Sequence, residues 1–105
     1  MKPFTEKVIT IIQNIPAGKV MTYGQIASLA GSPRGARQVV RILHSLSEKH
    51  DLPWHRVLNV KGEIGFKDFA QSNEQRLNLE CEGVTFIGPY AIDLEKHKYN
   101  PLSHF

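Results

Sequence analysis

The feature that most restricts how this chain can fold is a break in a helical pattern at Gly31, followed at once by Ser32-Pro33. Glycine commonly ends a helix, whereas serine before proline commonly begins one, with serine as N-cap and proline in the first turn. The pattern therefore predicts a short helix over 23–30, a tight turn, and a further helix from Ser32 to about residues 43–46. Two helices joined in this way form a helix-turn-helix.

Other helix signals lie on both sides of this pair. Apolar residues at helical spacing predict a first helix over 4–14 and a last helix over 73–82, which Gly83 closes. Thr22 and Gln25 have the spacing of a capping box, in which each side chain bonds to the other residue's backbone N–H. The short helix should therefore begin directly after Thr22.

The segment after Pro53 has the pattern of β-structure. Val57, Leu58 and Val60 predict a strand, Lys61-Gly62 a turn, and 64–66 a return strand. Residues 84–94 are expected to add a short strand, and the polar tail from Glu95 is expected to be loose. The predicted fold class is mainly α with a small β-hairpin, a winged helix-turn-helix DNA-binding domain over residues 1–105.

The predicted helix after the turn separates its charges from its apolar residues. For such a helix taken alone, an ordinary solvated face is an equal alternative to a binding face. Solvated faces usually mix lysine and glutamate. Here the polar face has three arginines and no acid, and guanidinium groups suit phosphate and base contacts. The second helix of a helix-turn-helix normally enters a DNA groove. The polar face holds Arg34, Arg37, Gln38, Arg41 and Ser45, and the apolar face holds Ala36, Val39, Val40 and Leu43.

Composition narrows the class of protein. A net charge of +3 and a pI near 9.2 permit nucleic-acid binding without establishing it. No apolar run approaches the ~20 residues of a membrane span, and the N-terminus lacks the apolar core of a signal peptide. We therefore expect no membrane contact and a cytoplasmic location, on the nucleoid when bound to DNA. The single cysteine, Cys81, cannot form an internal disulfide and is expected to face the core. The histidines do not have the spacing of metal ligands, so neither a metal nor a cofactor is predicted.

A specific resemblance begins at Pro53-Trp54-His55-Arg56-Val57. This segment resembles the Pro-Cys-His-Arg-Val motif of the O6-alkylguanine-DNA alkyltransferases, with tryptophan where that family has its alkyl-accepting cysteine. The substitution is typical of the family's alkyltransferase-like members. Further segments resemble the family in the same order, over about residues 4 to 94: 18–27, 35–40, 59–65 and 79–84.

The resemblance implies roles for individual residues. Arg37 matches the arginine finger that replaces a flipped nucleotide in the base stack, and Tyr23 matches the tyrosine that presses on the 3′ phosphate. His55 and Glu82 match the relay that activates the thiol, and Trp54 occupies the position of that thiol. Further DNA contacts are implied for Thr22, Arg34, Ala36, Gln38, Arg41 and Ser45, the last in place of the family's asparagine hinge. The lesion pocket is implied to include Tyr23, Trp54, Val57, Phe66 and Phe69.

The chemistry of Trp54 fits a protein that binds without reacting. Alkyl transfer from guanine O6 needs a strong nucleophile such as a thiolate, and an indole offers only an N–H donor and a flat apolar face. Trp54 can therefore form a wall for an alkylated base but cannot accept the alkyl group. Without a thiol, a structural hydrogen bond between His55 and Glu82 is expected, and Arg56 is expected to tie the loop to the core.

Three function classes remain open. The first is a monomeric, non-enzymatic sensor of O6-alkylguanine in double-stranded DNA, which flips the base, bends the DNA and presents it to nucleotide-excision repair proteins. The second is an active alkyltransferase that uses Cys81. The third is a winged-helix transcription regulator, which would need base-reading side chains and usually a dimer interface. The resemblance favours the sensor.

Overall fold

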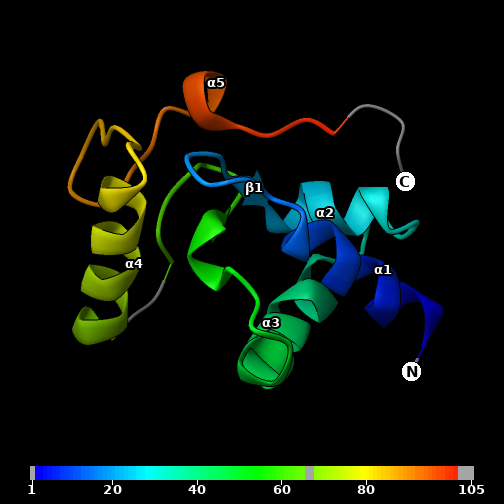
Figure 1. Cartoon of the computed structure of the whole chain (residues 1–105). Helices are drawn as coiled ribbons and strands as arrows, with labels where there is room; N and C mark the ends of the chain where they lie inside the picture. Colours follow the sequence, from blue (N-terminus) through cyan, green and yellow to red (C-terminus); the bar gives the residue numbers. More distant parts are fainter. Residues whose placement is uncertain (1, 66–67, 102–105) are drawn as a thin grey trace.

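The computed structural model describes residues 2–65 and 68–101 (Figure 1). Within these residues the protein is mostly helical, with a two-strand sheet and one 3-10 turn. No helix of the described residues has both the length and the apolarity that a bilayer span requires. The elements, in chain order, are α1 (Pro3–Gln13), β1 (Met21–Thr22), α2 (Tyr23–Leu29), α3 (Ala36–His50), η1 (Trp54–Arg56), β2 (Val57–Leu58), α4 (Phe69–Cys81) and α5 (Leu94–His97).

The first three helices form one apolar core. The predicted stripe of α1 is buried through Val8, Ile11 and Ile12, which pack against α2 and α3. The capping box at the start of α2 is confirmed: Thr22 Oγ1 accepts from the Gln25 N–H at 3.2 Å, and Gln25 Oε1 accepts from the Thr22 N–H at 3.3 Å. These two bonds satisfy N–H groups that a helix start would otherwise leave unpaired.

The predicted start of the next helix at Ser32 is wrong. Residues 32–35 form a turn in which the Gly35 N–H donates to the Ser32 carbonyl at 2.8 Å, and α3 begins at Ala36. A Cβ at Gly35 would lie 3.0 Å from the Phe4 ring, so this turn packs tightly against α1. The turn delays the start of α3 to Ala36, and Arg34 lies in the turn. The helix also runs past the predicted end, to His50, where Asp51 adopts a left-handed conformation.

The predicted β-hairpin is also wrong. Strand β2 pairs in parallel with β1, with Met21 opposite Val57 and Thr22 opposite Leu58. The segment after β2 makes a tight loop instead, in which the Asn59 side chain accepts from two backbone N–H groups at 3.0 Å each. The chain then pairs with 90–92, since the Ile64 N–H donates to the Tyr90 carbonyl at 2.9 Å. Residues 84–94 contribute isolated bridges and no strand.

The C-terminal part is more ordered than its polarity predicts. The last long helix, α4, starts at Phe69 because the Asp68 side chain accepts from the Ala70 N–H at 2.8 Å. Residues after Asp93 form α5, and buried His97 lies against the loop before β1, where its carbonyl accepts from the Val20 N–H at 2.9 Å. The expectation of a loose tail from Glu95 is therefore wrong for the residues up to 101.

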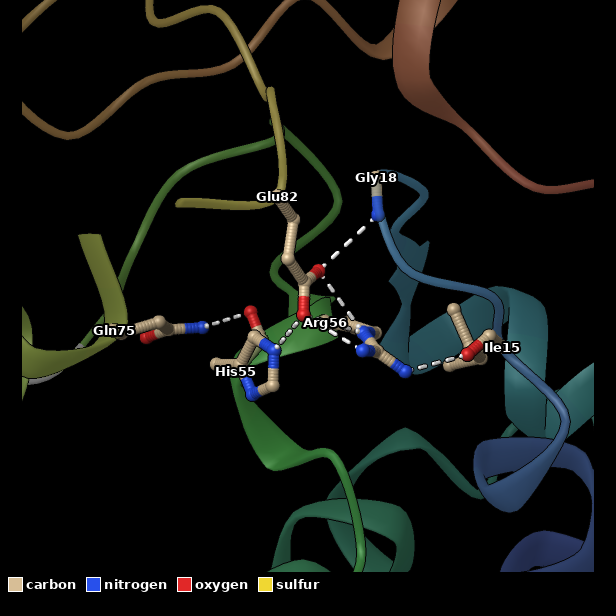
Figure 2. Close-up of polar contacts among 6 residues, drawn as sticks. All are labelled: Ile15, Gly18, His55, Arg56, Gln75 and Glu82. Atoms are coloured by element: carbon tan, nitrogen blue, oxygen red, sulfur yellow. Dashed lines mark hydrogen bonds and ion pairs between the residues drawn. The ribbon is translucent and has the colours of Figure 1, made fainter. Parts of the chain in front are cut away.

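Glu82, at the end of α4, joins three distant segments (Figure 2). One carboxylate oxygen accepts from Arg56 at 2.6 Å and from His55 at 2.7 Å, and the other accepts from the Gly18 N–H at 3.1 Å. Arg56 also donates to the Ile15 carbonyl at 2.8 Å, which confirms that it ties its loop to the core. The expected hydrogen bond between His55 and Glu82 is likewise confirmed.

The partners of Glu82 govern its ionisation. Partial burial alone would raise the pKa of this carboxyl. The hydrogen bonds from Arg56, His55 and Gly18 lower the pKa by more than burial raises it, so it falls from the usual 4.5 to about 2. Because the folded state holds the charged form, this group stabilises the fold above about pH 4.5, and the contribution is lost as pH falls towards about 2.

We predict that Glu82→Gln loses about 2–3 kcal/mol of unfolding free energy at neutral pH, since a neutral amide leaves Arg56 without its anionic partner. Denaturant unfolding between about pH 2.5 and pH 7 should show a smaller acid loss in the variant than in the wild type. Glu80→Gln is the control, because among the described residues the Glu80 side chain forms only an exposed pair with Arg76 at 3.4 Å, and it should change stability by less than about 0.5 kcal/mol. Identical pH profiles for wild type and Glu82→Gln would contradict the assignment.

Candidate nucleic-acid interface and base cavity

Helix α3 presents a basic face to solvent. Arg37, Gln38, Arg41 and Ser45 are all exposed on it, Arg34 is exposed in the preceding turn, and Ala36 is half-buried at the first helical position. The opposite side of α3 buries Val39 and Leu43 in the core. Within the described residues, none of the three guanidinium groups pairs with a carboxylate, so all three are available to an external anion.

Two residues of the predicted faces lie elsewhere. Thr22 is 5% exposed and its hydroxyl is used by the capping box, so this side chain positions α2 and offers no free surface. Val40 was expected in the core but is 43% exposed, because it lies on the side of α3 that borders a cavity. The helix thus has a buried side, a basic side and a cavity side.

The cavity beside α3 has a volume of about 230 Å³. It brings Tyr23, from the first turn of α2, together with Trp54, from η1. The side chains that line it are Tyr23, Val40, Leu43, His44, Ser47, Trp54 and Gln71.

Two of the remaining predicted pocket residues, Val57 and Phe69, do not line this cavity. Val57 is buried within β2, and Phe69 is 70% exposed at the start of α4. Phe66 lies outside the described residues. His44, Ser47 and Gln71 were missed by sequence reasoning. For His44 and Ser47 a signal existed, since they follow Val40 by four and seven residues and therefore share its side of the helix; nothing in the sequence marks Gln71.

Trp54 is held in place by backbone contacts on both sides of it. The backbone N–H of Trp54 donates to the Leu52 carbonyl at 2.8 Å. Gln75, buried in α4, donates from Nε2 to the carbonyls of His55 and Val57 at 3.1 Å each (Figure 2 shows the bond to His55). A glutamine in a helix carries no sequence signal of such a role, yet it anchors the turn that carries Trp54.

The cavity has hydrogen-bonding capacity but no strong nucleophile. Burial raises the pKa of the Tyr23 phenol, so that group stays neutral and able to donate at physiological pH. No residue lining the cavity has a thiol, and Cys81, which was expected to face the core, is exposed on α4. The rings of Trp54 and His55 meet edge to face, with centroids 6.4 Å apart, so His55 lies beside the indole and not beside a thiol.

No metal-binding arrangement occurs in the part of the chain that the structure describes, where no three His, Cys, Asp or Glu side chains gather. The site is therefore composed of aromatic walls, a few polar side chains and an adjacent basic helix. Such a combination can accommodate a planar group removed from an anionic polymer, because the arginines suit phosphates and the aromatic faces suit a base.

Comparisons with known proteins identify relatives in both sequence and fold. Residues 3–84 match the family model described as 6-O-methylguanine DNA methyltransferase, DNA binding domain. The chain is 45% identical to the DNA base-flipping protein of Escherichia coli K12, over 92% of this chain and 74% of that protein. It is 39% identical to alkyltransferase-like protein 1 of Schizosaccharomyces pombe, over 96% of this chain and 98% of that protein.

A solved structure matches nearly the whole fold. The crystal structure of the S. pombe alkyltransferase-like protein in complex with damaged DNA containing O6-carboxymethylguanine superimposes with a TM-score of 0.85, at 38% identity, over 96% of this chain and 98% of that one. Since both sequence and fold agree over almost the full length, this chain belongs to the family of the 6-O-methylguanine DNA methyltransferase DNA-binding domain.

Proposed function

We propose that this protein binds duplex DNA containing O6-alkylguanine, rotates the altered nucleotide into the cavity between α2, α3 and η1, and leaves the alkyl group in place. The observation that carries the proposal is the position of Trp54. Trp54 forms a wall of the cavity. By the resemblance of residues 53–57 to the family motif, it takes the position of the alkyl-accepting cysteine. A flipped base read between aromatic side chains is the usual arrangement for proteins that act on unstacked bases.

The relatives support this proposal. One is called a DNA base-flipping protein, and another was crystallised with DNA containing O6-carboxymethylguanine. In this chain Arg37 lies on the basic face of α3, three residues before Val40 at the cavity, so that one helix can enter the groove and border the pocket at the same time. Arg37 then fills the gap left by the flipped nucleotide, and Tyr23 presses on the neighbouring phosphate.

A protein that binds a lesion without removing it must pass it on. We extend the proposal to a monomer that bends the DNA it binds and presents the lesion to nucleotide-excision repair proteins. An active alkyltransferase is disfavoured because the described cavity has no thiol and Cys81 lies outside its lining. A sequence-reading regulator is disfavoured because such a protein has no use for an aromatic-walled cavity next to its recognition helix.

The absence of chemistry gives the first test. We predict preferential binding of a duplex with O6-methylguanine over the matched undamaged duplex, with the intact mass of the protein unchanged after prolonged incubation. An indole cannot perform the displacement that a thiolate performs. Fluorescence anisotropy and mass spectrometry provide the two readouts. A mass gain of one methyl group would establish a transferase, and equal affinity for both duplexes would favour a regulator.

Arg37 and Arg41 form a matched pair on the same exposed face. We predict that Arg37→Ala weakens lesion binding by about 1–3 kcal/mol and undamaged-DNA binding by less, because only the flipped state has a gap for its guanidinium. Arg41→Ala should weaken both by a similar, smaller amount, as expected for a phosphate contact. The assignment of Arg37 as the finger is wrong if the two variants lose affinity equally on both duplexes.

Trp54 is the third test. We predict that Trp54→Ala loses about 1–3 kcal/mol of lesion binding, the value of stacking on one aromatic, and leaves undamaged-DNA binding nearly unchanged. Trp54→Cys restores the family motif beside the intact bond between His55 and Glu82. Transfer further requires the sulfur within about 3–3.5 Å of the alkyl carbon and in line with the leaving oxygen. A cavity shaped around tryptophan is too wide for that contact, so at most very slow transfer is expected, and fast stoichiometric transfer would refute the reshaped cavity.

A further inference from the structure

A groove on the outer side of α2 is distinct from the base cavity. It has a volume of about 540 Å³, and α2 contributes Gly24, Gln25 and Ser28 to its lining. Tyr23, the first residue of the same helix, lines the base cavity instead. The lining also includes Pro33, from the turn that leads into α3, and residues from the segment 98–101. The groove therefore borders the first helix of the helix-turn-helix, the turn and the C-terminal segment.

The segment after α5 has a defined position beside this groove (Figure 1). The Val20 N–H donates to the His97 carbonyl at 2.9 Å, and the Tyr99 N–H donates to the Val20 carbonyl at 2.8 Å. The side chain of Tyr99 packs against the apolar core of the first three helices. Because side chains alternate along an extended chain, Lys98 and Asn100 point the other way, and both are exposed.

Gln25 joins this segment to the start of α2. Its Oε1 accepts in the capping box, and its Nε2 donates to the Tyr99 carbonyl at 2.6 Å and to Asn100 Oδ1 at 3.2 Å. Since the Asn100 oxygen accepts from Gln25, the NH₂ group of Asn100 points away from it, and that group makes no hydrogen bond within the described residues. An exposed amide donor and the ammonium group of Lys98 thus line one groove, and both suit a ligand that accepts hydrogen bonds.

The charges around the groove favour an anion. Among its lining residues Lys98 has the only charged side chain, and none is an acid. Two further lining residues, Pro33 and Val60, are followed in the sequence by the exposed cations Arg34 and Lys61. Within the part of the chain that the structure describes, none of these three cations pairs with a carboxylate. Three segments far apart in the sequence therefore place positive charge in the groove lining or one residue away from it.

We propose that this groove is a second contact with the DNA backbone, in which Lys98 and Asn100 bind a phosphate apart from those that α3 contacts. This inference rests on the proposed function, because it requires α3 to lie on the duplex. When the second helix of a helix-turn-helix enters a DNA groove, the first helix crosses the backbone. That first helix is α2, and its outer side borders the groove. Lysine, asparagine and serine side chains are all common donors to phosphate oxygens, and exposed Ser28 adds a hydroxyl.

The first test removes the charge of Lys98. The affinity for a duplex with O6-methylguanine is measured by fluorescence anisotropy between about 50 and 200 mM salt, for wild type and Lys98→Gln. The loss of one phosphate contact should make the slope of log affinity against log salt shallower by about 0.9. The ratio of the wild-type affinity to that of the variant should therefore fall about threefold over this range, equally for the lesion and the undamaged duplex.

Lys96→Gln is the matched control for this charge. Lys96 is also exposed and precedes Lys98 by two residues, but it lies outside the groove lining. Both variants lose one positive charge and neither disturbs a buried contact. The salt slope of Lys96→Gln should equal that of the wild type.

The second test changes Asn100 and keeps its bond to Gln25. Asn100→Asp retains an oxygen that accepts from Gln25 and replaces the free donor with a negative charge. The affinity for the lesion duplex should fall about twofold to fivefold at about 0.1 M salt. Gln13→Glu adds the same charge at the exposed end of α1, outside the groove lining, and should bind as wild type.

A third measurement identifies the phosphate. A neutral methylphosphonate replaces one phosphate at a time along both strands of the lesion duplex, and each contacted position lowers the affinity of the wild type. In Lys98→Gln the loss at one position, or at two adjacent ones, should disappear, while the losses at all other positions persist. Such a pairing of one protein group with one phosphate follows the logic of a double-mutant cycle.

The outcomes separate this inference from the proposed function. If the wild type binds the O6-methylguanine and guanine duplexes equally, the proposed function fails, and a shallower slope in Lys98→Gln would still establish the backbone contact. If the lesion is preferred but Lys98→Gln and Lys96→Gln have the same slope, the proposed function stands and the phosphate contact is wrong. It is also wrong if Lys98→Gln reduces all methylphosphonate losses alike. Wild-type affinity in Asn100→Asp would remove that residue from the contact.

Discussion

The relative positions of α4, η1 and the loop before β1 depend on one carboxylate, that of Glu82. It receives hydrogen bonds from His55, Arg56 and Gly18, and so joins the end of α4, the η1 turn and the loop before β1. Its pKa of about 2 keeps it charged at any physiological pH, so the junction holds throughout that range. In the family motif the same pair, His55 and Glu82, would activate a thiol. Here it serves to fix the turn that carries Trp54.

Helix α3 presents different residues to the core, to solvent and to the cavity. Arg37 and Arg41 face solvent, while Val40, His44 and Ser47 follow one another at spacings of four and three residues along the cavity. Because a helix of 3.6 residues per turn has room for three distinct sides, one element contributes to the core, the basic face and the cavity wall. Under the proposed function, a nucleotide leaving the duplex at the basic face has only to move around the same helix.

Local signals in the sequence were reliable where a short segment decides its own conformation. The capping box of Thr22 and Gln25 and the apolar stripe of α1 were both predicted, since each depends on neighbours a few residues away. The start of α3 was not, since residues 32–35 form a turn that is closed by the Gly35 N–H and the Ser32 carbonyl and lies against Phe4 of α1. The hairpin failed for a similar reason: Val57 and Leu58 find their partners in Met21 and Thr22, more than thirty residues earlier.

The sequence by itself determined the helix-turn-helix, the arginine-rich face and the family, because these depend on local periodicity and on ordered motifs. The resemblance of residues 53–57 to the family motif also predicts that Trp54 takes the cysteine position. Only the tertiary structure decided which side chains surround that indole: it brought Tyr23, His44 and Gln71 to one cavity and left Val57 and Phe69 out. It also revealed Gln75 as the support of η1. Such contacts join segments far apart in the chain, and their geometry follows from packing and hydrogen bonding that no local pattern encodes.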